Sequence, residues 1–75
     1  MERGWPELGQ AIRRRRREAR LSQERLAELA GLHWTYLSEV ETARVNPSIG
    51  VVRQIAGALG VKMSELVAEA EGIGR

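Results

Sequence analysis

The amino-acid sequence predicts an all-α protein, a compact bundle of five helices in which a tight turn joins the second helix to the third. Apolar residues recur at spacings of three and four in five successive segments, as the buried face of a helix requires. Serine, glycine and proline separate these segments at positions that favour helix ends. No segment alternates apolar and polar residues in the way that a half-buried strand does. The pattern therefore indicates helices throughout.

The first two helices are bounded by residues with strong preferences for helix ends. A helix over residues 6–19 would begin at Pro6, because the first turn does not need the N–H that proline lacks. Ser22 is a good N-cap for the second helix, and Gly31 would end that helix in a left-handed conformation. The expected apolar positions of these two helices are Leu8, Ile12, Ala19, Leu26, Leu29 and Ala30.

The other three helices follow from the same signals. A third helix is expected over residues 33–41, and a loop over residues 42–47 follows it, since that segment ends in an Asn-Pro pair. Ser48 and Ser64 would cap the fourth and fifth helices, and Gly60 would end the fourth. The expected apolar positions of these helices are Leu37, Val40, Ile49, Val52, Ile55, Ala56, Leu59, Leu66, Val67 and Ala70.

The size of the chain limits what it can form. We expect 75 residues to make one domain over 1–75, with its core over about 8–70 and a tail over 71–75 that frays. With no cysteine and a single histidine, neither a disulfide nor a metal site is expected, and no cofactor is expected either. The sequence contains no signal-peptide pattern and no apolar run long enough to span a membrane. A cytoplasmic protein is therefore expected.

Positive charge is concentrated in the first part of the chain. Residues 1–20 hold seven Arg and three Glu, a net charge of +4, whereas residues 21–75 hold five Lys or Arg and seven Glu, a net charge of −2. This asymmetry favours a nucleic-acid partner, although a solvated Arg-rich helix face explains it equally well. Arg13, Arg14 and Arg17 are expected to stay solvated and to attract DNA at long range.

The second and third helices carry the functional signal. Gly31 supplies a tight turn between them, while Leu37 and Val40 would face the core. The side chains that remain outward on the third helix are His33, Trp34, Thr35, Ser38 and Glu39. They mix hydrogen-bonding and apolar groups, unlike the Lys and Glu of an ordinary solvent face. A helix presented in this way can enter the DNA major groove with its N-terminal residues nearest the base edges.

Residues 22–48, SQERLAELAGLHWTYLSEVETARVNPS, resemble the helix-turn-helix of the Cro/repressor-type regulators, the XRE family. The shared positions are Ser22-Gln23-Glu24, Leu26-Ala27, Ala30-Gly31, Leu37-Ser38, Val40-Glu41 and Asn46-Pro47-Ser48. The resemblance implies a lambda-repressor-like bundle with its helix-turn-helix at the second and third helices. The chain length and the TYLS…E…NPS pattern are similar to those of restriction–modification controller proteins, and short phage repressors and antitoxins share much of the pattern.

The resemblance also implies roles for individual residues. The positions that contact base edges correspond to Trp34, Thr35, Ser38 and Glu39. The positions that contact DNA phosphates correspond to Gln23, His33, Tyr36, Arg44 and Asn46. Arg16 and Glu41 resemble the ion pair by which many members tie the first helix to the recognition helix.

Two positions depart from the pattern of the family. Many members have Gly where this chain has Ala43, so a different type of turn is expected after the third helix. Controller proteins often have Arg, which reads guanine, where this chain has Trp34. Unless it lies in the core or an interface, Trp34 can press on a thymine methyl or a sugar. Glu39 is either an acceptor for cytosine N4 or a solvated carboxylate, and Trp5 is expected to pack against the first helix.

The last two helices carry more apolar residues than a lone domain of this size needs to bury. A two-fold dimer interface is therefore predicted at Val61, Met63, Leu66 and Val67. Two recognition helices would then lie about 34 Å apart and read a palindrome.

The expected function is a sequence-specific transcriptional regulator that binds a palindromic operator as a homodimer, with residues 33–41 in the major groove. The alternative is an antitoxin or another protein-interaction module that retains the fold. An enzyme is disfavoured, because the sequence offers no nucleophile–base pair, carboxylate pair or phosphate-binding glycine loop. No small-molecule ligand is expected.

Overall fold

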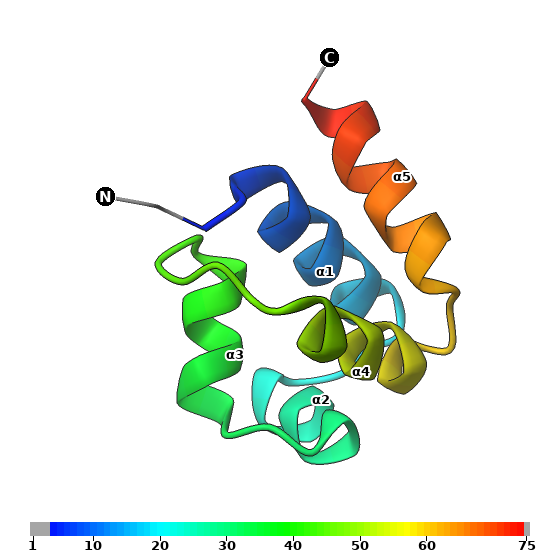
Figure 1. The fold of residues 1–75 in the computed structure, drawn as a ribbon. Coiled ribbons are helices and arrows are strands. Elements are labelled where there is room, and N and C mark those ends of the chain that lie inside the picture. The colour runs from blue at the N-terminus through cyan, green and yellow to red at the C-terminus, as the bar shows by residue number, and fades with distance from the viewer. Residues whose placement is uncertain (1–3, 75) are drawn as a thin grey trace.

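The computed structural model describes residues 4–74, which form five α-helices and no strand (Figure 1). The helices are α1 (Pro6–Glu18), α2 (Gln23–Ala30), α3 (Trp34–Glu41), α4 (Ile49–Leu59) and α5 (Met63–Ile73). The predicted all-α bundle of five helices is thereby confirmed. None of these five helices is long and apolar enough to cross a membrane.

The helices pack around α1. This helix contacts α3, α4 and α5, while α2 packs against α3 and α4. Figure 1 shows α3 and α5 on opposite sides of the molecule, with α1 between them. The position of α3 relative to the rest of the protein therefore depends on its contacts with α1 and α2.

The predicted caps of α2 and α4 are present. The hydroxyl oxygen of Ser22 accepts a hydrogen bond from the backbone N–H three residues later at 3.0 Å, and that of Ser48 does the same at 3.2 Å. Gly31 and Gly60 follow the two helices with φ values of 72° and 74°. This left-handed conformation is inexpensive for glycine, which explains why both helices end where they do.

Both ends of α5 differ from the prediction. The helix begins before Ser64, because its N-cap is Lys62, whose backbone N–H donates to Glu65 Oε1 at 2.9 Å. A carboxylate at the third helical position thus takes the place of the expected serine cap. The helix also continues through Gly72, so residues 71–73 of the tail that was expected to fray are helical. The last residue of the chain lies outside the described residues.

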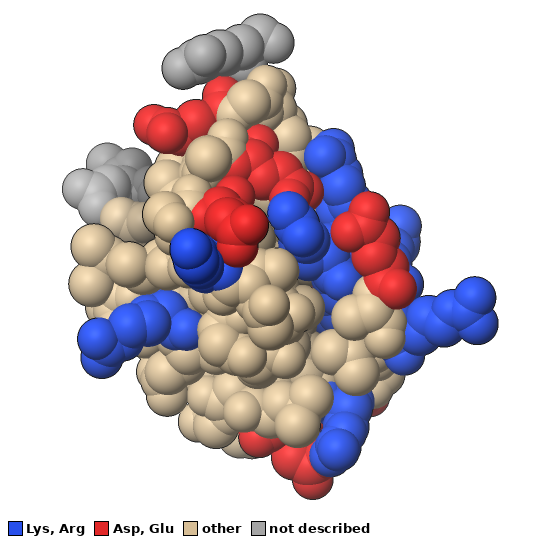
Figure 2. Space-filling view, turned by 90° about the vertical axis from the view of Figure 1, so that its right-hand side faces the viewer, with Lys and Arg blue, Asp and Glu red and all other residues tan. Residues whose placement is uncertain are grey.

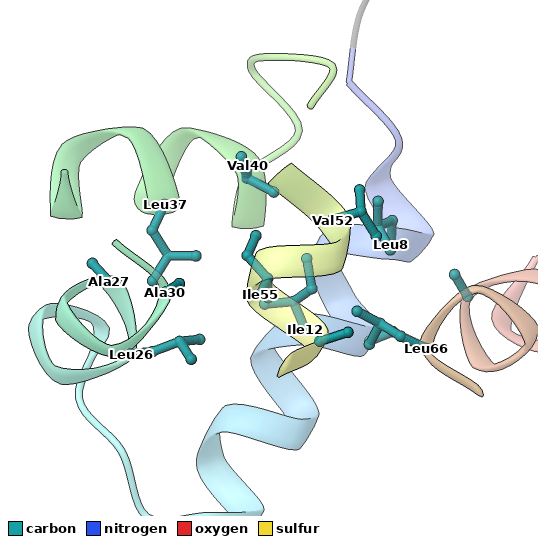
Figure 3. Packing of buried hydrophobic residues seen from close by; sticks show 13 residues of the cluster. Leu8, Ile12, Leu26, Ala27, Ala30, Leu37, Val40, Val52, Ile55 and Leu66 are labelled. Carbon is teal, nitrogen blue, oxygen red and sulfur yellow. The ribbon is translucent and has the colours of Figure 1, made fainter. Parts of the chain in front are cut away.

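One apolar core joins all five helices (Figure 3). Its buried members are Leu8, Ala11, Ile12, Leu26, Ala27, Ala30, Leu37, Val40, Val52, Ile55, Ala56, Leu66 and Ala70. Five predicted apolar positions are not among these members. Leu59 and Val67 are half-buried against the core, Leu29 is 47% exposed, Ile49 is 77% exposed, and Ala19 is the exposed C-cap of α1. Periodicity identifies the face of a helix, but a residue at a helix end is buried only if another element covers it.

Gly9 lets α1 lie directly against the backbone of α3. A Cβ atom at Gly9 would stand 2.4 Å from the carbonyl oxygen of Glu41 and 2.8 Å from that of Val40. No side chain larger than hydrogen fits at that distance. The absence of a side chain at Gly9 is therefore a condition for the observed placement of α3.

We expect Gly9→Ala to lower the free energy of unfolding by about 1–3 kcal/mol, because the added methyl group must push α1 away from α3. Gly57 in α4 is a matched control, since a Cβ there meets nothing within 4 Å. Gly57→Ala is expected to raise the free energy of unfolding by about 0.5–1 kcal/mol, as alanine favours helix. Urea denaturation followed by circular dichroism measures both. Similar effects of the two substitutions would contradict the close approach.

Candidate DNA interface

Helices α2 and α3 form a helix-turn-helix. The turn consists of residues 31–33, and the backbone N–H of Leu32 donates to the carbonyl of Ala27 at 2.8 Å. Ala27 is buried at the contact between the two helices, where its small side chain permits them to lie close. The tight turn holds α3 at a fixed angle to α2 and leaves one side of α3 uncovered.

The uncovered side of α3 carries the four residues predicted to contact base edges. Trp34 is 48% exposed and Thr35 is exposed, whereas Ser38 and Glu39 are half-buried. Leu37 and Val40 on the other side of the helix are fully buried in the core. We call the surface formed by Trp34, Thr35, Ser38 and Glu39 the α3 face. It joins an indole, two hydroxyls and a carboxylate on one outward surface.

His33 is the N-cap of α3. Its Nδ1 atom accepts a hydrogen bond from the backbone N–H of Thr35 at 3.4 Å. The same Nδ1 atom lies 2.7 Å from Thr35 Oγ1. The imidazole thus contacts both the backbone N–H and the hydroxyl of Thr35, and it lies exposed at the start of the α3 face.

A buried ion pair joins α1 to the end of α3. Arg16 Nε donates to Glu41 Oε2 at 2.7 Å, and a second guanidinium nitrogen donates to Glu41 Oε1 at 3.0 Å. The remaining guanidinium nitrogen donates to the carbonyl of Leu21 at 3.0 Å. Gln23, the first residue of α2, also donates to Glu41 Oε1 at 3.0 Å. The Glu41 carboxylate therefore holds α1, α2 and α3 together.

The other predicted phosphate contacts lie around this unit in different settings. Tyr36 is half-buried and packs against the core. Arg44 is exposed in the loop directly after α3. Asn46 is exposed further along the same loop, where it lies beside apolar residues rather than on the α3 face. Gln23 is half-buried by its contact with Glu41.

The turn after α3 was expected to be of a different type because Ala43 stands where many family members have Gly, and this expectation is wrong. Ala43 has a φ of 61°, the left-handed conformation that glycine adopts most easily. The turn thus keeps the conformation that Gly would favour, although an L-residue there costs roughly 1–2 kcal/mol. The Ala43 carbonyl accepts a hydrogen bond from the backbone N–H of Gly4 at 3.1 Å, so the segment before α1 covers this turn.

An apolar groove of about 260 Å³ lies beside this loop. It is lined by Trp5, Leu8, Asn46, Pro47, Ile49, Val52, Met63 and Val67. We call it the α4–α5 groove. Met63 and Val67, two of the predicted dimer residues, lie in it, but Leu66 is fully buried and cannot contact a partner. Sequence reasoning missed Ile49 as a groove residue because its spacing matches the buried positions of α4.

The arginine run of α1 faces several directions. Arg14 and Arg15 both contact Glu69 of α5, at 3.4 Å and 2.7 Å, and the hydrogen bond to Glu69 raises the pKa of Arg15. Arg13 and Arg17 line a shallow open depression beside Arg14. Figure 2 views the side that lies at the right of Figure 1, away from α3, and shows Lys and Arg side chains gathered there among carboxylates.

We expect Arg16→Ala to lower the free energy of unfolding by about 3–5 kcal/mol, because it leaves the Glu41 carboxylate buried without its cation. The double variant Arg16→Met/Glu41→Leu removes both charges and is expected to recover most of the loss. Arg25→Ala, which breaks the exposed contact with Glu28, serves as control and should cost less than about 1 kcal/mol. Chemical denaturation measures all three. A cost for Arg16→Ala as small as that of the control would contradict the linking role.

Known helix-turn-helix proteins are similar to this chain in sequence and structure. Residues 7–70 match the helix-turn-helix domain family. The immunity repressor protein of Bacillus phage phi105 is 44% identical over 62 residues, which are 83% of this chain and 43% of the repressor. The chain thus spans less than half the length of that relative.

Two solved structures share the fold. The restriction–modification controller protein C.AhdI from Aeromonas hydrophila has a TM-score of 0.81 at 37% identity, covering 83% of this chain and 94% of the controller. SinR, a master regulator for biofilm formation solved in complex with DNA, has a TM-score of 0.74 at 36% identity, covering 80% and 97%. The resemblance to Cro/repressor-type regulators that residues 22–48 predicted is confirmed. The chain belongs to the helix-turn-helix domain family.

Proposed function

We propose that this chain is a sequence-specific DNA-binding regulator of transcription whose helix α3 enters the major groove of an operator. The observation that carries the proposal is the α3 face, which presents hydrogen-bonding and apolar groups outward while the opposite side of the helix is buried. The major groove is wide enough for an α-helix, and base edges there offer donors, acceptors and the thymine methyl. The relationship to SinR, whose structure was solved with DNA, supports the same function.

Contacts with phosphates would position α3 in the groove. Gln23 donates one amide hydrogen to Glu41 and has a second for a phosphate oxygen. It also begins α2, whose unpaired N–H groups attract an anion. Arg44, exposed after α3, would supply a charged contact on the other side of the groove.

A homodimer would place two α3 helices on a palindromic operator. The α4–α5 groove supports this, because it holds Met63 and Val67 beside Ile49, an isoleucine that is 77% exposed. Burying such a surface on a second copy is favourable and adds to a small core. In this proposed role the chain needs no cofactor and no catalysis, and it acts in the cytoplasm. In the alternative role, an antitoxin or other interaction module, the same groove would seat a different protein.

Substitutions on the two kinds of contact are expected to affect DNA binding differently. Trp34→Ala and Thr35→Ala should reduce the preference for the operator over unrelated DNA, since these side chains face the bases. Gln23→Ala should weaken binding to all sequences by a similar factor, since phosphates carry no sequence information. Gel-shift titrations at several salt concentrations, where affinity falls as salt rises, measure both effects. No effect of either class on binding would refute the groove placement.

The dimer is tested by substitution in the groove. At micromolar concentration the protein is expected to sediment as a dimer, and Ile49→Gln should shift it toward monomer because a polar side chain disfavours burial. Leu29→Gln is the matched control, since Leu29 is an exposed leucine that does not line the groove. Sedimentation equilibrium measures both variants. A strictly monomeric parent protein would rule out the dimer.

A further inference from the structure

We infer that His33 fixes the hydroxyl of Thr35 as a hydrogen-bond acceptor, so that α3 reads the exocyclic amino group of an adenine or cytosine. The inference rests on the proposed entry of α3 into the major groove. It assigns His33 a positioning role and Thr35 a defined chemical preference.

The geometry at the start of α3 determines which nitrogen of His33 carries hydrogen. Thr35 is the second residue of the helix, so its backbone N–H has no partner within the helix and needs an acceptor. His33 Nδ1 provides that acceptor at 3.4 Å and therefore carries no hydrogen itself. The hydrogen of the neutral imidazole is then on Nε2, where it can donate to a phosphate.

The same assignment fixes the direction of the second contact. An Nδ1 atom without hydrogen, 2.7 Å from Thr35 Oγ1, can only accept the hydroxyl hydrogen. The hydroxyl then has no hydrogen left for a base and presents only its lone pairs outward. A threonine hydroxyl can ordinarily donate or accept a hydrogen bond. Here it can only accept, so its partner on the DNA must be a hydrogen-bond donor.

The neighbouring groups extend this acceptor character. Glu39 lies four residues after Thr35, so the two side chains are neighbours along the same side of α3. An ionised carboxylate also accepts hydrogen bonds and donates none. The polar groups of Thr35 and Glu39 thus make two adjacent acceptors.

Only two bases present a hydrogen-bond donor on their edge in the major groove. The donors there are the N6 amino group of adenine and the N4 amino group of cytosine, whereas guanine and thymine present only acceptors on their own edges. Opposite guanine O6 or thymine O4, the oxygen of Thr35 would face another acceptor. On the strand that Thr35 contacts, adenine or cytosine is therefore favoured.

The test begins with selection of duplexes from a random pool by the parent protein and by Thr35→Val, which keeps the side-chain shape and removes the oxygen. The position at which the variant loses preference marks the Thr35 contact, and the parent protein is expected to select adenine or cytosine there. Replacing that base by purine or 2-pyrimidinone, which lack the amino group, is expected to weaken binding by the parent protein about fivefold and to leave Thr35→Val unchanged.

Two variants of His33 separate positioning from helix stability. His33→Ala frees the hydroxyl hydrogen, so the ratio of affinities for operators with and without the preferred base should fall toward one. His33→Asp keeps an N-cap side chain that only accepts hydrogen bonds, so the ratio of the two affinities should be retained. The added negative charge is expected to weaken binding to both operators alike. Mere loss of the helix cap would scale both affinities and leave the ratio unchanged.

The failures of the two proposals are distinguishable. Enrichment of no duplex by the parent protein would overturn the proposed function and this inference with it. Enrichment of guanine or thymine at the Thr35 contact, no position dependent on Thr35, or an unchanged ratio in His33→Ala would overturn the inference alone.

Discussion

The ion pair between Arg16 and Glu41 fixes where α3 lies on the rest of the protein. The side chains are 11% and 2% exposed, and the carboxylate also accepts a hydrogen bond from Gln23. Removing the two charges from water costs most of the free energy that their attraction provides. The contribution of the pair to net stability is therefore small. Its geometric effect is larger, because one carboxylate sets the distances among α1, α2 and α3. The α3 face and the start of α2 therefore lie at fixed positions relative to each other.

Helix α1 performs four tasks because successive residues point about 100° apart around a helix. Gly9 permits backbone contact with α3, and Ile12 fills the core. Arg16 reaches the Glu41 carboxylate, while Arg15, which points to another side of the helix, reaches Glu69 of α5. The consecutive arginines therefore do not form a single DNA-binding surface. We propose that those on the side away from α3 attract DNA through long-range charge rather than through contact in the same groove.

Much of the fold could be predicted from the sequence, because the signals for helix ends are local. Ser22 and Gly31 bound α2 as their chemistry requires. The errors concern what covers a helix face: Ile49 matches the period of α4 yet is exposed, whereas Leu66 was expected at an interface and is buried. The members of the α3 face followed from the spacing of buried positions. The contact between His33 and Thr35 did not, since it depends on side-chain rotamers that no sequence pattern specifies.

Whether α3 lies in the major groove can be measured directly, because the chain contains no cysteine. An iron chelate attached at Thr42→Cys, the exposed C-cap of α3 outside the α3 face, generates hydroxyl radicals that cleave nearby DNA, and Ser64→Cys, exposed on α5, is the control. If α3 lies in the major groove, the reagent on α3 cleaves the operator within each half-site, in the staggered pattern of the major groove, and the control cleaves weakly or elsewhere. Equal cleavage from both positions, or cleavage from the α5 position alone, would show that α3 does not lie in the major groove.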